Sequence, residues 1–297
     1  MKQISWHIDH LKDLSQRGGP EESEWQATIE WMDEIGSAIE KKQYIEEEIA
    51  LFYQHISQLF PPDTIHGLIY HKPRKYAGDF ELLNRIQTRN VTTDNRFRKW
   101  DEYFHHCAAP CAVRFRIKYL HDLLEKKMTI YPEGFHFLNI SSGACWDISE
   151  FYKKHPDAKI YIECLEHERD AIELAKKFLQ NKEKEIVFHH SNILRFRFEK
   201  KYDFIWAAGL FDYLNEEIFI KILNRLISNT NKGGEIVIGN LKVTNPTRYY
   251  MLILQWIVIH RTENQMKELA KAAGASDEQI YIFTEQLGVN MFLHIQC

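Results

Sequence analysis

Apolar residues recur at every third or fourth position in two stretches near the start of the chain, residues 25–39 and 45–59. This spacing places them on one face of a helix, so it predicts two amphipathic helices. Pro61 and Pro62 end the second helix, because proline cannot continue the backbone hydrogen-bond pattern. A further helical stretch is predicted over residues 95–127.

The pattern changes at residue 135, where short apolar runs begin to alternate with amphipathic stretches. Strands that alternate with helices indicate a parallel sheet covered on both faces. Two final apolar runs follow each other without a helix between them, which predicts a closing hairpin. The predicted strands cover about 135–140, 159–165, 185–189, 204–208, 235–239, 279–284 and 289–295, with helices at about 146–154, 168–181 and 216–229.

The predicted fold class is therefore α/β, with a seven-stranded, mostly parallel, Rossmann-like sheet that ends in an antiparallel hairpin, plus an N-terminal helical region. We expect two domains. Residues 1–130 form a helical cap or lid region, and residues 131–297 form the Rossmann-like domain.

The turn after the first strand is the first candidate site. Ligands of open parallel sheets bind beyond the carboxyl ends of the strands, where small residues let them approach the backbone. Glu166 ends the second strand, at the offset expected of an acid that accepts hydrogen bonds from ribose hydroxyls. The candidate residues at these two strand ends are Asn139, Ser141, Ser142, Gly143, Ala144, Glu166 and His167.

The ends of the third and fourth strands complete the candidate site. Asn192 is suited to accept from the exocyclic amine of an adenine, and Ile193 to pack on its ring. Ala208, Gly209 and Leu210 are small or apolar and leave room for the rest of such a cofactor. Each turn alone is also compatible with an ordinary strand-to-helix connection, but the four in this order favour a nucleoside-containing cofactor.

Further phrases extend the pattern beyond these turns. Together with the turns, they resemble the class I S-adenosylmethionine-dependent methyltransferases, and among these the bacterial 3-hydroxy fatty acid methyl ester synthase-like subfamily. The similar phrases are residues 72–80 (KPRKYAGDF), 100–104 (WDEYF), 208–214 (AGLFDYL), 239–248 (GNLKVTNPTR) and 287–290 (LGVN).

The resemblance covers roughly residues 65–295 and implies S-adenosylmethionine as cofactor and methyl transfer, in enzyme class EC 2.1.1, to a small-molecule acceptor such as a carboxylate or another metabolite. The sequence departs from the family at glycine-type positions. Ser141 and Cys145 stand at two of the small positions of the first motif, with Trp146 after them, and Lys75 replaces a glycine before Tyr76.

Candidates for acceptor binding follow from the chemistry. A carboxylate nucleophile needs no general base, but it needs a cationic clamp, and guanidinium can hold it through two hydrogen bonds. Arg116 and Arg248 are the candidate clamps, with Arg114 and Arg261 as further choices. Each arginine could also be an ordinary surface or helix-end residue, and each tyrosine a packing residue. The other candidates are Tyr76 and Asp79 in a lid loop, and Tyr103 and Tyr213 lining the acceptor pocket.

Composition limits the partners. The formal net charge is −4, with a pI near 6.4, which disfavours a general role in binding nucleic acid or an anionic membrane. The five cysteines are scattered and favour a reducing cytoplasm, and no paired cysteine motif indicates metal. A non-catalytic cofactor-binding protein and, less strongly, a nucleic-acid methyltransferase or a nicotinamide-dependent dehydrogenase stay open as alternatives. We also consider a homodimer formed through the N-terminal helices.

Overall fold

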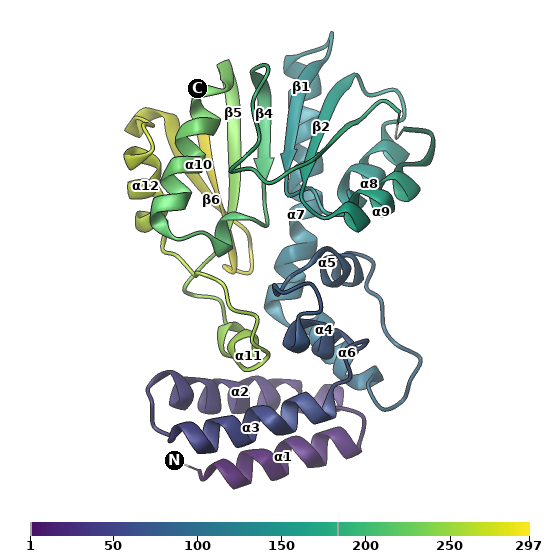
Figure 1. Ribbon diagram of the computed structural model, residues 1–297, viewed down its shortest axis with the longest axis vertical. Helices are drawn as coiled ribbons and strands as arrows, with labels where there is room; N and C mark the ends of the chain where they lie inside the picture. The colour runs from purple at the N-terminus through teal and green to yellow at the C-terminus, as the bar shows by residue number, and fades with distance from the viewer. Residues whose placement is uncertain (1, 183) are drawn as a thin grey trace. The chain divides into compact units, whose positions relative to one another are not determined.

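The computed structural model describes residues 2–182 and 184–297. Contacts within the chain divide it into two compact units (Figure 1). Unit 1 is Met1–Cys111 with Asn245–Ile257, and unit 2 is Ala112–Thr244 with Val258–Cys297. The segment Asn245–Ile257, which the sequence analysis assigns to the Rossmann-like domain, therefore packs with the N-terminal helices.

Unit 2 contains a seven-stranded sheet in the order β3-β2-β1-β4-β5-β7-β6. The pairs among β1 to β5 are parallel, whereas β7 runs antiparallel to both β5 and β6. The predicted fold class, including the closing hairpin, is confirmed. The strands are β1 (Phe135–Ile140), β2 (Ile160–Glu166), β3 (Val187–His190), β4 (Tyr202–Ala207), β5 (Thr230–Leu241), β6 (Ile280–Thr284) and β7 (Asn290–Gln296).

Helices cover both faces of this sheet. Side chains alternate between the faces along each strand, so one strand contributes to the core on each face. Phe135 and Phe137 of β1 pack in one core cluster with residues of α7, α8 and α9. Leu138 and Ile140 pack in the other with residues of α10 and α12. The helices are α7 (Ala108–Ile130), α8 (Trp146–Lys154), α9 (Arg169–Leu179), α10 (Glu216–Ser228) and α12 (Glu263–Ala272).

Unit 1 is helical. Its helices are α1 (Ile4–Gln16), α2 (Trp25–Glu40), α3 (Glu46–Leu59), α4 (Ile65–His71), α5 (Phe80–Gln87), α6 (Arg98–His106) and α11 (Arg248–Ile253). The two predicted amphipathic helices correspond to α2 and α3. The loop that contains Tyr76 leads into α5. No helix within residues 2–182 and 184–297 combines the length and the apolar composition needed to cross a membrane.

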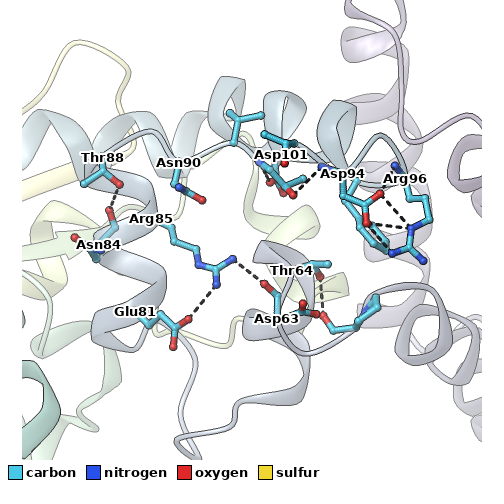
Figure 2. Close-up of a pocket in the computed structure, with 15 residues that line it drawn as sticks. Asp63, Thr64, Glu81, Asn84, Arg85, Thr88, Asn90, Asp94, Arg96 and Asp101 are labelled. Carbon is cyan, nitrogen blue, oxygen red and sulfur yellow. Dashed lines mark hydrogen bonds and ion pairs between the residues drawn. The ribbon is translucent and has the colours of Figure 1, made fainter.

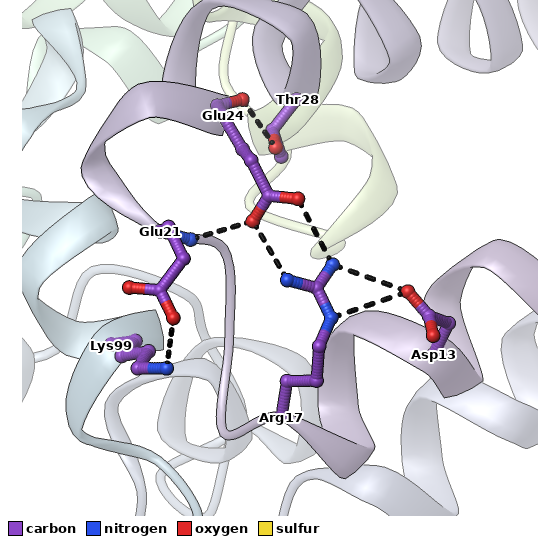
Figure 3. Close-up of polar contacts among 6 residues, drawn as sticks. All are labelled: Asp13, Arg17, Glu21, Glu24, Thr28 and Lys99. Carbon is purple, nitrogen blue, oxygen red and sulfur yellow. Dashed lines mark hydrogen bonds and ion pairs between the residues drawn. The ribbon is translucent and has the colours of Figure 1, made fainter.

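An exposed network of ion pairs joins the end of α1 to the short helix η1 (Glu22–Glu24) and to α6 (Figure 3). Arg17 donates to Asp13 at 3.1 Å and to Glu24 at 2.9 Å. Lys99 of α6 pairs with Glu21, which precedes η1. Each exposed pair contributes at most about 1 kcal/mol, so the network mainly orients the turn between α1 and α2.

Two predicted element boundaries need correction. Residues 95–127 form two helices, α6 and α7, because Cys107 is extended. Pro110 then lies in the first turn of α7, where its missing N–H has no helical partner to lose. The second correction concerns strand β5, which was predicted over residues 235–239: it begins at Thr230 and pairs there with Tyr202.

Candidate cofactor site

The loop after β1 holds an unusual series of backbone conformations. Ser141, Gly143 and Cys145 have φ values of 51°, 56° and 51°. This left-handed region costs about 1–2 kcal/mol for a residue with a side chain. Lys75 of unit 1 has a φ of 70°. Ser141, Cys145 and Lys75 stand where the family that the sequence resembles has glycine-type residues, and they keep the conformation that glycine favours.

The loop is fastened to its surroundings on both sides. Its Ser142 N–H donates to Leu165 O of β2 at 3.3 Å. The thiol of Cys145 is buried and lies 3.5 Å from the thiol of Cys164 on β2. The ring of Trp146 packs edge-on against Phe178 of α9. The side chains of Cys145 and Trp146 therefore fill space in the core and against a neighbouring helix.

Glu166, the last residue of β2, connects the two strand ends. Its Oε2 accepts from Gly143 N at 2.8 Å, and its Oε1 accepts from the backbone N–H groups of His167 and Glu168 at 2.7 and 3.0 Å. Burial opposes ionisation, but the hydrogen bonds from His167 and these N–H groups hold the pKa of Glu166 below its usual range. The site therefore presents a buried carboxylate anion, whose Oε2 has one recorded donor and can accept another.

His167 competes for the same carboxylate. Its Nδ1 lies 2.9 Å from Glu166 Oε1, and this contact raises the pKa of the imidazole. The ring itself is partly exposed. A ligand that hydrogen-bonds Glu166 through two hydroxyl groups would displace this exposed ring more readily than the backbone donors.

A buried polar atom without a partner lies on β1 itself. Asn139 is 3% exposed, and its Nδ2 finds no hydrogen-bond acceptor among the described residues. Buried amide donors in proteins are nearly always satisfied. An acceptor group from a ligand or a water molecule at the end of β1 would satisfy this amide.

The candidate residues after β3 have local partners. Asn192 is exposed and its Oδ1 accepts from Leu194 N at 2.8 Å. Ile193 is buried in the core cluster that includes α10. Their proposed contacts with adenine stay predictions.

The chain after β4 passes close to β5 at one glycine. A side chain at Gly239 of β5 would place its Cβ 2.8 Å from Ala208 O, so β5 needs glycine to pass this point. A Cβ at Gly209 would meet Arg116 Nη1 at 3.7 Å, an ordinary contact. Gly209 thus lies beside Arg116, and the guanidinium group of α7 reaches the chain just after β4.

Arg116 belongs to a buried polar cluster in unit 2. Its Nη2 donates to Asn290 Oδ1 at 2.7 Å and lies 3.5 Å from Asp212 Oδ2. Burial lowers the pKa of Arg116 and raises that of Asp212, although the two charges oppose these shifts. Tyr213, the neighbour of Asp212, is 36% exposed. The sequence analysis did not identify Asn290 as a site residue, because its contact with Arg116 joins distant parts of the chain.

The guanidinium of Arg261 is hydrogen-bonded within the protein. It is buried and donates from Nη1 to Phe211 O at 2.9 Å and to Asn240 Oδ1 at 2.7 Å. Its Nη2 donates to Leu214 O. These bonds fix the short helix η3 (Phe211–Tyr213) against β5, which places Asp212 and Tyr213.

The other acceptor candidates belong to unit 1. Asp79 caps α5 by accepting from Leu82 N at 2.9 Å, and Arg248 forms an ion pair with Glu40 of α2. Tyr103 is fully buried, with its ring 5.3 Å from that of Tyr250. Tyr76 lies in the loop before α5. Asp79, Arg248 and Tyr103 thus have structural contacts within unit 1, and the acceptor-binding roles of all four stay predictions.

No protein-family model matches the chain, and no curated protein matches it in sequence. Solved structures match its fold. A possible exported protein from Bordetella parapertussis is 12% identical, with a TM-score of 0.61 over 84% of this chain and 93% of that chain. A candidate O-methyltransferase from Nostoc punctiforme is 11% identical, with a TM-score of 0.50 over 84% of this chain and 72% of that chain. At these identities the likeness shows the fold alone, a Rossmann-like sheet that the Nostoc candidate O-methyltransferase shares.

Proposed function

We propose that the protein is an S-adenosylmethionine-dependent methyltransferase that acts on a small-molecule acceptor. One observation carries the proposal. The buried anion Glu166, at the end of β2, is hydrogen-bonded to Gly143 in the left-handed loop after β1. In a sheet of this strand order, that is the place where a ribose and its attached groups bind. The fold shared with the Nostoc candidate O-methyltransferase supports the same class of reaction.

The residues at the strand ends fit the proposed cofactor. Glu166 Oε2 is available to accept from a ribose hydroxyl, and the unpartnered Asn139 Nδ2 is a donor at the end of β1. Gly209, which follows β4, has no side chain to fill the position beside Arg116. S-adenosylmethionine supplies a methyl group already activated by a sulfonium centre. The protein therefore has to bind, orient the acceptor and exclude water.

Arg116 is the acceptor-orienting residue that we favour. Its largely buried guanidinium lies beside Gly209, just after β4, and close to Asp212. Its buried Nε has no hydrogen-bond partner among the described residues. A carboxylate acceptor would satisfy such a donor, so we propose a small acid as acceptor, in agreement with the resemblance to the 3-hydroxy fatty acid methyl ester synthase-like subfamily.

Transfer of a labelled methyl group tests the proposed function. The purified chain is incubated with methyl-labelled S-adenosylmethionine and a panel of small carboxylic acids, phenols and amines. We expect label in an acid product, and a loss of about tenfold or more in kcat/KM for Glu166→Gln, since one charge-assisted hydrogen bond contributes about 1.5–3 kcal/mol. Glu168→Gln, two residues further on and at a more exposed position, is the matched control and should retain activity.

A second candidate function is a protein that binds the cofactor without turnover. The side chains at Ser141 and Cys145, in conformations that favour glycine, are the observation behind it. The same panel separates the two functions. Cofactor binding without label in any acid, phenol or amine product would favour the second candidate, whereas product in the acid series would exclude it.

A further inference from the structure

A polar cavity of about 690 Å³ lies within unit 1 (Figure 2). The proposed methyl transfer assigns it no role. It is partly open to solvent and is lined by the residues before α4, by α5, by the loop between α5 and α6, and by Asp101 of α6. Its volume is in the range of sites for small organic molecules. The charged side chains of its lining are Asp63, Glu81, Asp94, Asp101, Arg85 and Arg96.

The charges of the cavity do not balance. Glu81 pairs with Arg85 at 3.0 Å, and Asp94 pairs with Arg96 at 2.6 Å. Asp63 and Asp101 have no cation within ion-pair distance in the part of the chain that the structure describes. Arg85 also donates to the backbone O of Asp63 at 2.8 Å, so its guanidinium is already engaged. Neither carboxylate thus has an ion-pair partner of its own, although Arg96 acts on Asp63 and Arg85 on Asp101 from a greater distance.

Asp101 shows the imbalance most clearly. It is 2% exposed, and its Oδ2 accepts from Thr92 N at 2.9 Å. Its Oδ1 is buried and has no hydrogen-bond partner among residues 2–182 and 184–297, and the same is true of Asn84 Oδ1 on α5. Both atoms are acceptors. Burial raises the pKa of Asp101 to about 6, so the carboxylate is ionised at neutral pH without a donor for this oxygen.

We propose that this cavity binds a small aliphatic amine, with the ammonium group held by Asp101. An ammonium group brings three donors and a positive charge, which match the unpartnered acceptors and the unpaired carboxylates. Pro61, Val91 and Phe97 give the lining apolar surface for the methylene groups. A metal ion fits less well, because the described residues include no group of three or more His, Cys, Asp or Glu arranged to hold one.

Calorimetric titration of the full chain at pH 8 tests the proposal, with 1,4-diaminobutane and n-butylamine as probes and butyrate as the matched anion. We expect the amines to bind with a Kd of about 1 mM or tighter, and butyrate not to bind. Asp101→Asn keeps an oxygen that can accept from Thr92 N, and it should weaken amine binding about tenfold, or about 1.4 kcal/mol. Asp63→Asn, at an exposed position, should weaken it less. Asp122→Asn, on α7 of unit 2, should have no effect.

The pH dependence provides a second readout. Arg85 lowers the pKa of Asp101 and Glu102 raises it, but burial dominates both. Protonation of Asp101 should therefore weaken amine binding about tenfold between pH 8 and pH 5, and Asp101→Asn should remove most of this change. The proposal is overturned if no amine binds at about 20 mM, if butyrate binds as tightly as butylamine, or if folded Asp101→Asn binds the amines as the wild type does.

Discussion

At the scale of single residues, the loop after β1 shows how the chain uses left-handed conformations without glycine. The offset from Gly143 was sufficient to predict that Glu166 ends the second strand, because a parallel βαβ unit fixes that spacing. The hydrogen bond from Gly143 N to Glu166 bears out the expected proximity of the two strand ends. The contact between Arg116 and Asn290 could not be predicted, since no periodic pattern links α7 to the start of β7.

Substitution of Ser141 tests the backbone conformation of this loop. Ser141→Gly should raise the free energy of unfolding by about 0.5–1 kcal/mol, because relief of the left-handed strain exceeds the extra flexibility of glycine in the unfolded chain. Ser142→Gly is the matched control. Ser142 is not among the residues with positive φ, so glycine there should lower the free energy of unfolding by a similar amount. Urea unfolding measures both, and a loss of stability in Ser141→Gly would contradict the account.

A buried histidine in unit 1 predicts a specific pH dependence. His66 is 1% exposed, and its Nε2 lies 2.6 Å from Tyr250 Oη. Burial lowers its pKa to about 3. As the pH falls below 6.5, the unfolded chain therefore gains a proton that the folded chain does not. This should lower the free energy of unfolding by about 1.4 kcal/mol per pH unit from pH 6.5 toward pH 3.

The comparison with His66→Gln isolates this effect. The raised pKa of Asp101 acts in the opposite sense, because the folded state then gains the proton first. Denaturant unfolding at pH 7 and pH 5 should show that the wild type loses about 2 kcal/mol more than His66→Gln over this interval. His71→Gln, on the same helix, is the control. Equal pH dependence in the wild type and His66→Gln would refute the assignment.

At the scale of elements, the sequence was most informative where an apolar period was unbroken. The regular stripes of α2 and α3 and the alternation of strands and helices in unit 2 were sufficient to predict those elements. Helix α1 was not predicted, because the buried His7 interrupts its apolar stripe. His7 is accommodated there by Trp31 Nε1, which donates to its Nδ1 at 2.9 Å, and by Tyr44 Oη near its Nε2 at 3.0 Å. These partners come from α2 and from the segment before α3, so sequence spacing could not reveal them.

The crossing of α2 and α11 offers a test at this scale. Gly36 of α2 packs directly on Tyr249 of α11, and an added Cβ would lie 2.6 Å from Tyr249 Cβ. Gly36→Ala should therefore destabilise unit 1 by about 1–3 kcal/mol, although alanine is the better helix former. Ser37→Ala, the next residue on α2, should be neutral or slightly stabilising. Tryptophan fluorescence during urea unfolding reports both, and increased stability in Gly36→Ala would show that the helices do not pack this closely.

At the scale of the whole molecule, the chain combines a helical unit and a Rossmann-like unit, each with a buried interior of its own. The helical unit takes in Asn245–Ile257, so its fold requires chain from before β1 and chain from between β5 and β6. A periodic apolar pattern cannot reveal that a distant segment packs with the helical unit, since it reports local structure only. The homodimer considered from the N-terminal helices stays a prediction, which the sedimentation of the full chain would examine.

The central claim is that the carboxyl end of the sheet binds S-adenosylmethionine through Glu166. Calorimetric titration of the full chain with S-adenosylhomocysteine tests it most directly. The account predicts one site per chain with a Kd of about 100 μM or tighter, and binding at least about tenfold weaker for Glu166→Gln. Absence of binding by the folded wild type at millimolar ligand, or equal affinity in Glu166→Gln, would contradict it.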